Sequence, residues 1–177
     1  AEPAPKQRPL MKDFIGINTF CDQFRPELYR ETCELVRNYH NYPWDVGEDS
    51  AQSPVYPLAR REFDGKAFDW GALDGYWKKN GWRTEVSIKL QYMPSQDWKD
   101  VEKDAYAYGK AFAEFFGPSG ENKLVEAVEV GNEPAHYSTE FYGRIFEAMA
   151  RGLRDGDPKI KVLPAAIQAG NPDKWAK

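Results

Sequence analysis

The sequence is poor in the residues that most metal and redox sites require. Its 177 residues include two cysteines, Cys21 and Cys33, and two histidines, with no C-x-x-C pair. So few thiols cannot form a disulfide framework or a structural zinc site. We therefore expect no metal and no cofactor. We expect Cys33 to be a buried apolar side chain. A bridge to Cys21 remains the alternative, and it would suit an oxidising compartment.

Long apolar runs and an excess of positive charge are also missing. The chain has 24 basic and 28 acidic side chains, a net charge of -4, which supports neither nucleic-acid nor anionic-membrane partners. No apolar run approaches the roughly 18 residues that span a bilayer. The Pro-rich opening AEPAPKQRP lacks a pattern and predicts a flexible leader over residues 1–11. Because small residues flank signal-peptide cleavage sites, it indicates a secreted or periplasmic protein.

Short apolar runs alternate with segments of helical spacing along the rest of the chain. The runs predict strands at residues 14–19, 36–43, 84–93, 124–130 and 160–167. Helices are predicted from Pro26, over 69–80, over 98–116, and from Ser138 to the DGDP segment. The Asp-, Ser-, Pro- and Gly-rich stretch 44–68 is interpreted as a long functional loop. Regular alternation predicts parallel strands with right-handed crossovers.

Two α/β folds fit this order: a doubly wound open sheet and a TIM (β/α)₈ barrel. No G-x-G-x-x-G follows the first strand, so the sequence favours the barrel. Barrel enzymes carry their functional groups where the strands end. The residues predicted at these positions are Asn18, Arg37, His40, Tyr92, Asn132, Glu133 and Gln168.

The run VEVGNEPAHY, residues 128–137, is the most informative motif. Asn132 and Glu133 directly follow the fourth predicted strand, and Pro134 stops that strand from continuing. With this motif, and with FDWGALDGYWKKNGWRTEVSIKL and LVRNYHNYPWD, the sequence resembles clan A retaining glycoside hydrolases. Their (β/α)₈ barrels carry Asn-Glu-Pro at the end of strand four. The resemblance covers most of residues 12–170, with 44–68 as an insertion.

The resemblance implies a site in which Glu133 is the acid/base and Asn132 hydrogen-bonds the 2-hydroxyl of the cleaved sugar. It implies retaining double displacement on a β-linked poly- or oligosaccharide, with a nucleophilic Glu on strand seven. The sequence predicts five strands and ends at Lys177. We therefore expect residues 12–177 to be the N-terminal part of a barrel that lacks the nucleophile and is inactive alone. The remaining C-terminal part would be a separate chain.

Other residues of the predicted strand ends are candidates for supporting roles. Glu129 shares a strand face with Glu133, and it either pairs with Arg37 inside the barrel or contacts substrate directly. Arg37 is expected to support the carboxylates. His40 and His136 are candidate sugar contacts, with a surface position as the alternative for His136. We expect at least one of five loop rings to stack on a sugar, namely Trp44, Tyr92, Trp98, Tyr137 and Trp175.

Two other classes of protein remain open on the sequence alone. A non-catalytic carbohydrate-binding or scaffold protein could be built on a truncated barrel. A barrel aldolase or lyase would need a Schiff-base lysine inside the barrel, and Lys89 is the candidate. The sequence does not identify the sugar or its linkage, although a long loop at 44–68 favours a polymeric substrate.

Overall fold

The computed structural model describes residues 10–11, 15–19, 25–61 and 64–166. Most of the predicted leader lies outside the described residues. The same is true of Cys21, Gln168 and Trp175. Cys33 is buried with a free thiol, as the sequence predicts for an apolar side chain. Within the described part, no helix is long and apolar enough to cross a membrane.

A parallel sheet of five strands forms the centre of the fold, in the order β1-β2-β5-β6-β7. These strands are β1 (Gly16–Asn18), β2 (Leu35–Asn41), β5 (Arg83–Lys89), β6 (Ala127–Asn132) and β7 (Lys161–Ala166). All the strands predicted from sequence are confirmed, with shifted ends. Within the described residues β1 and β7 are the two edges, and each pairs with one neighbour. The strand order therefore follows the chain.

The three long helices between these strands begin within three residues of their predicted starts. The long helices are α2 (Trp70–Lys79), α3 (Val101–Phe116) and α4 (Thr139–Gly156). Asp69, Asp100 and Ser138 cap them, each accepting a hydrogen bond from a backbone N–H of the first turn, at 2.9, 3.2 and 3.1 Å. Such caps satisfy backbone donors that have no partner inside the helix.

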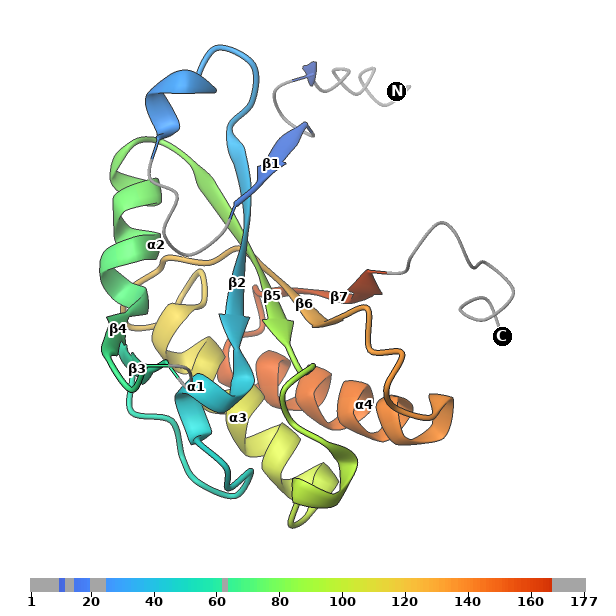
Figure 1. Cartoon of the computed structure of the whole chain (residues 1–177). Coiled ribbons are helices and arrows are strands. Elements are labelled where there is room, and N and C mark those ends of the chain that lie inside the picture. The colour runs from blue at the N-terminus through green and yellow to red at the C-terminus, as the bar shows by residue number, and fades with distance from the viewer. Residues whose placement is uncertain (1–9, 12–14, 20–24, 62–63, 167–177) are drawn as a thin grey trace, which may run out of the picture.

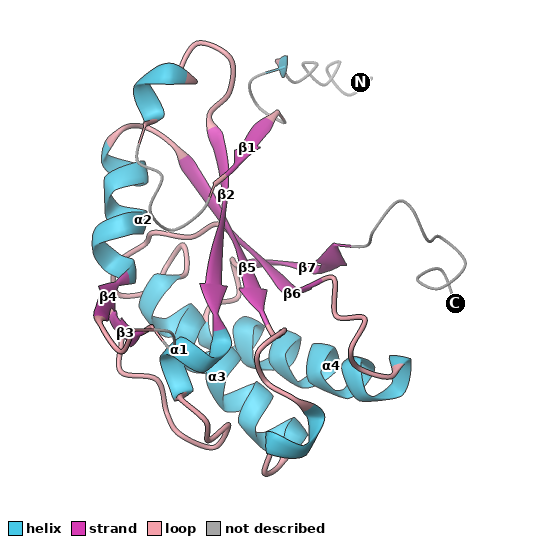
Figure 2. Ribbon diagram, viewed as in Figure 1, coloured by secondary structure: helices cyan, strands magenta, loops and turns pink. Residues whose placement is uncertain are grey.

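Helices α2, α3 and α4 all lie on one side of the sheet (Figures 1 and 2). A doubly wound sheet would carry helices on both faces, and its strand order would reverse at a switch point. Sequential parallel strands with helices outside are the pattern of a (β/α)₈ barrel. The fold is thus an incomplete TIM barrel, in which the described residues supply five of the eight strands.

Two predicted segments differ in the structure. The helix predicted from Pro26 is a single 3₁₀ turn, η2 (Pro26–Leu28), because Leu35 and Val36 already pair with β1 and β5 as part of β2. The stretch 44–68 is not a plain loop. It contains the end of α1 (Tyr42–Val46), where Pro43 sits in the first turn, and the antiparallel pair β3 (Leu58–Arg60) and β4 (Ala67–Asp69). A second 3₁₀ turn, η3 (Ser95–Asp97), precedes α3.

The core lies between the sheet and the helices. The sheet contributes apolar side chains that are fully buried: Val36, Val86, Ile88, Val128 and Val130. The helices contribute Trp70, Trp77, Phe112 and Phe116, also fully buried. Alternate strand residues point to the opposite face, which in a closed barrel is the interior. That second face carries the polar side chains of the candidate site.

Candidate active site

Arg37 and Glu129 form a bidentate ion pair on the interior face of the sheet. Arg37 Nε donates to Glu129 Oε2 at 2.7 Å, and Nη2 donates to Oε1 at 2.8 Å. Arg37 lies on β2 and Glu129 on β6, so the pair spans β5, which lies between them. The backbone N–H of Ala166, on β7, also donates to Glu129 Oε1, at 2.7 Å. The predicted pairing of Glu129 with Arg37 is confirmed.

Arg37 also holds Asn132. Its Nη2 donates to Asn132 Oδ1 at 3.1 Å, which fixes which end of the amide faces the arginine, since a guanidinium can only donate. The remaining donor of Arg37, Nη1, reaches the Tyr39 hydroxyl at 2.6 Å and Asn18 Oδ1 at 3.3 Å. One guanidinium therefore ties together β1, β2 and β6 at the point where Asn132 ends its strand.

Glu85 on β5 joins this cluster and was not singled out from the sequence. Its Oε1 lies 3.7 Å from Arg37 Nε. Burial raises the pKa of Glu85, the neighbouring Glu129 raises it further, and Arg37 opposes the shift. A signal was present in the sequence, because Glu85 alternates with Val86 and Ile88 and must point away from the helices.

The backbone bends sharply where β6 delivers Glu133. Gly131 has a φ of 92° and Glu133 has a φ of 47°, in a backbone region that residues other than glycine rarely adopt. The Glu133 N–H donates to Ala166 O at 3.1 Å, and the Ala135 N–H donates to Glu133 O at 2.7 Å. Held conformations of this kind cluster at functional sites. The bend places Glu133, half-buried, directly after the strand end.

Tyr142 on α4 stabilises this bend. Its hydroxyl donates to Val130 O at 2.7 Å and accepts from the Ala165 N–H at 2.9 Å, so it bridges β6 and β7. Burial raises the pKa of Tyr142 to about 12, which keeps the hydroxyl protonated as the donor. A Cβ at Gly131 would lie 3.3 Å from the Tyr142 ring, which is closer than ordinary contact. Nothing in the linear sequence marks this role.

Two of the predicted site residues do not join the cluster. His40 is fully buried on the helix side of the sheet, where its ring stacks on Trp70 at 3.9 Å and its Nε2 lies 3.1 Å from Asp74. His40 lies three positions after Arg37 on β2, so the two side chains face opposite sides of the sheet. The structure therefore does not support a sugar contact by His40. Tyr137 is also buried; its hydroxyl accepts from Trp98 Nε1 at 3.2 Å, so neither ring presents an open face.

The remaining candidates lie along the same rim. His136 is exposed next to Glu133 and packs on Tyr137, with ring centroids 3.9 Å apart. Tyr92 follows β5 and is half exposed. Trp44 lies in α1, largely buried against Trp70. The structure thus brings Arg37, Glu129 and Asn132 together, and Glu133 follows Asn132 in the chain. Among the described residues no group of three or more potential metal ligands occurs.

The groups on the interior face of the sheet are suited to binding a ligand and to transferring a proton. A fixed guanidinium, paired carboxylates and an oriented amide surround the end of β6, and a further carboxylic acid follows on a bent backbone. Such a set can orient a polyhydroxylated ligand and deliver a proton to it. Lys89 lies on the same face, 5.3 Å from the Tyr39 ring centroid and 5.5 Å from that of Tyr92.

Solved glycoside hydrolases have a similar fold. The chain matches the endoglucanase Cel5A of Pseudomonas stutzeri with a TM-score of 0.56 and 13% identity, covering 78% of this chain and 40% of that one. A family 39 glycoside hydrolase from the gut symbiont Bacteroides cellulosilyticus WH2 matches with a TM-score of 0.57 and 13% identity, covering 84% of this chain and 30% of that one. The GH53 catalytic domain of Ignisphaera aggregans matches with a TM-score of 0.55 and 12% identity, covering 84% of this chain and 44% of that one.

The chain therefore spans less than half the length of each of these structures. No family model and no curated protein matches the sequence. At such low identity the likeness shows the fold alone. It is the fold of TIM-barrel glycoside hydrolases, represented here by part of the barrel.

Proposed function

We propose that the chain is part of a retaining glycoside hydrolase that cleaves a β-linked poly- or oligosaccharide, with Glu133 as its acid/base. One observation carries the proposal. Glu133 follows the fourth strand of a sequential parallel barrel segment, on a backbone held at positive φ, next to an asparagine that an arginine orients. Active sites of TIM barrels are built at these strand ends.

The chemistry assigns a part to each residue. A glycosidic oxygen leaves readily only when a carboxylic acid protonates it, and the same carboxylate then activates the incoming water. Glu133 performs both steps. Asn132 Oδ1 is engaged by Arg37, so its Nδ2 is the donor that can bind the 2-hydroxyl of the cleaved sugar. Arg37 and Glu129 are positioning residues for this asparagine.

A retaining mechanism also needs a nucleophilic carboxylate about 5–5.5 Å from the acid/base. Glu129 accepts hydrogen bonds from Arg37 Nε, from Arg37 Nη2 and from the Ala166 N–H, so it is a poor nucleophile. We expect the nucleophile on the seventh strand of the complete barrel, two strands beyond β7 of this chain, and we expect the partner of this chain to be the part that carries that strand. A secreted or periplasmic location is proposed from the opening residues alone.

The test uses Glu133→Ala in the full-length protein. We expect turnover of an unactivated glycoside to fall at least about 100-fold, because general acid catalysis typically contributes that much. A dinitrophenyl glycoside needs no protonation of its leaving group, so its first step should be little affected, and azide should then capture the glycosyl-enzyme as a glycosyl azide. Glu147→Ala, an exposed glutamate on α4, is the matched control.

Turnover of the unactivated glycoside within tenfold of the parent would remove Glu133 from this role. If neither the parent nor any variant hydrolyses glycosides, but the protein binds them, a non-catalytic carbohydrate-binding protein becomes the better reading. A Schiff-base enzyme would instead be trapped at Lys89 by borohydride and a carbonyl substrate.

A further inference from the structure

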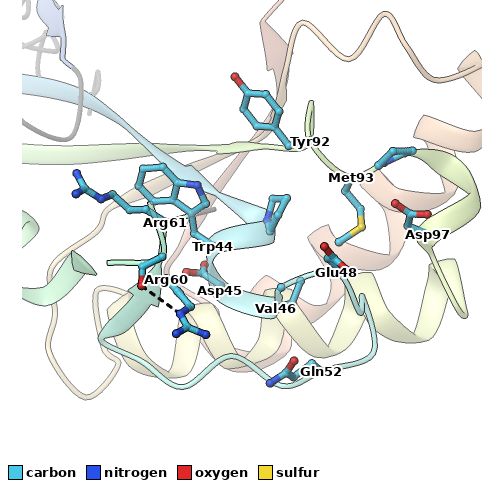
Figure 3. A pocket seen from close by; sticks show the side chains of 14 residues that line it. Trp44, Asp45, Val46, Glu48, Gln52, Arg60, Arg61, Tyr92, Met93 and Asp97 are labelled. Atoms are coloured by element: carbon cyan, nitrogen blue, oxygen red, sulfur yellow. Dashed lines mark hydrogen bonds between the residues drawn. The ribbon is translucent and has the colours of Figure 1, made fainter. Parts of the chain in front are cut away.

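A pocket of about 850 Å³ opens where the chain leaves β2 and β5. Its walls come from α1, from the β3–β4 hairpin and from the turn after β5 (Figure 3). In the figure the Tyr92 ring stands at one side, and Arg60 and Gln52 stand at the opposite side. Because α1 follows β2 and the turn follows β5, the pocket lies at the same carboxyl-end rim of the sheet as Glu133.

Hydrogen bonds to Asp45 hold the α1 wall of the pocket in place. Its carboxylate accepts from Trp70 Nε1 at 2.7 Å, from the Tyr108 hydroxyl at 2.6 Å and from the Tyr56 hydroxyl at 3.3 Å. These donors come from α2, from α3 and from the segment that leads into β3. Trp44 packs on Trp70 with ring centroids 5.6 Å apart. The pocket is therefore formed before any ligand arrives, which lowers the entropic cost of binding.

The lining combines an aromatic ring with donors and acceptors of both charges. Tyr92 is 54% exposed, so its ring is accessible at the rim. Arg60 is exposed, and its Nε donates to Gly65 O at 3.2 Å, which steadies the guanidinium. Glu48 and Gln52 add acceptors and an amide. A pyranose has a C–H face that packs on aromatic rings and a rim of hydroxyls that donate and accept. The mixture of charges favours a neutral ligand over an ionic one.

The turn after β5, which lines the pocket, is hydrogen-bonded to the end of β6. Gln91, next to Tyr92, donates from Nε2 to the Asn132 backbone oxygen. β2, β5 and β6 are consecutive strands of the sheet, and neighbouring strands lie about 4.8 Å apart, so the two strands that lead into the pocket lie within roughly 10 Å of β6. A carbohydrate chain bound at Glu133 could extend into it.

We propose that this pocket is a subsite for the uncleaved part of a neutral carbohydrate chain, so that the protein selects long substrates over short ones. The inference rests on the proposed function. It assigns a purpose to the segment 44–68, whose α1 end and hairpin build the pocket. Tyr92 packs on the sugar, and Arg60 and Glu48 bind hydroxyls.

The test measures binding in a Glu133→Gln background, in which the ligand is not cleaved. Soluble cello-, xylo-, manno- and laminari-oligosaccharides of two and six units are titrated by calorimetry. We expect at least one six-unit series to bind more tightly than its two-unit counterpart. Tyr92→Ala and Arg60→Ala should each weaken the six-unit ligand about tenfold, the loss of roughly one charged hydrogen bond or ring contact, and leave the two-unit ligand unchanged. Tyr76→Ala, an exposed tyrosine on α2, is the control and should change neither.

The outcomes separate this proposal from the function on which it rests. If six-unit ligands bind equally well to the parent, Tyr92→Ala and Arg60→Ala proteins, the subsite is wrong, whatever Glu133→Ala does to turnover. If the length-dependent affinity is lost in these variants but Glu133→Ala leaves turnover intact, the subsite stands and the assignment of Glu133 fails. Glu48→Ala, exposed on the same pocket, provides an independent variant should either of the others fold poorly.

Discussion

Replacement of Arg37 by methionine tests the interior cluster most directly. The change keeps an unbranched apolar stem and removes the guanidinium, with its hydrogen bonds to Glu129, Asn132, Tyr39 and Asn18. The side chain of Glu129 is only 6% exposed and would keep one partner, the Ala166 N–H. The neighbouring Glu85 would then repel it without compensation.

The magnitude follows from the burial of the pair. Removing one partner of a buried ion pair costs about 3–5 kcal/mol, because the other charge is left without compensation. Arg37 is 19% exposed and Glu129 keeps a backbone donor, so we place Arg37→Met near the lower end, at about 3 kcal/mol. With a urea dependence of about 2 kcal/mol/M, the unfolding midpoint would fall by about 1.5 M.

The chain offers a matched control on its surface. Arg144 also binds a glutamate through two donors, with Nε to Glu102 Oε1 at 2.6 Å and Nη2 to Oε2 at 2.8 Å. Both side chains are 47% exposed. An exposed pair of this geometry is worth about 0–1 kcal/mol, so Arg144→Met should shift the midpoint little. Both variants remove a bidentate arginine–glutamate pair, largely buried at Arg37 and half exposed at Arg144, and Arg37→Met also removes the hydrogen bonds to Asn132, Tyr39 and Asn18.

Urea unfolding followed by tryptophan fluorescence and by circular dichroism gives the free energies. The double variant Arg37→Met/Glu129→Gln should recover at least half of the loss, because Glu129, the more deeply buried of the two neighbouring glutamates, then carries no charge. The reasoning fails if Arg37→Met costs no more than Arg144→Met. It fails equally if the effects of the two single changes simply add in the double variant.

Two further predictions concern packing and pH. In α4 a Cβ at Gly152 would lie 2.1 Å from the Tyr106 backbone oxygen of α3, whereas one at Gly143 meets nothing within 4 Å. Gly152→Ala should therefore destabilise by about 2 kcal/mol or more and Gly143→Ala should stabilise by about 0.5–1 kcal/mol in thermal unfolding, and equal effects would contradict the close helix contact. Glu85 has a raised pKa in the folded state, so its contribution to stability is full below the ordinary glutamate pKa and is lost as pH rises through the folded pKa. Glu85→Gln should thus gain stability over the parent at pH 7 and lose that advantage near pH 4, and a pH-independent difference would refute the burial of this charge.

Much of the candidate site could be predicted from local patterns. The pairing of Arg37 with Glu129 follows from strand alternation and charge, and the position of Glu133 follows from Pro134 and the strand before it. The same alternation argues against the prediction that His40 shares the site with Arg37. The two residues lie three positions apart on one strand, so their side chains must face opposite sides of the sheet.

The sequence by itself determined the order of the five sheet strands and of α2, α3 and α4, since periodicity depends on neighbours a few positions away. Only the tertiary structure decided which face of the sheet the helices cover, and hence that His40 is buried among the helices whereas Arg37 lies on the interior face. It also brought Tyr142 between β6 and β7, bent the chain at Glu133, and folded α1 and the hairpin around a pocket. These features depend on contacts between residues far apart in the chain, which a local pattern does not encode.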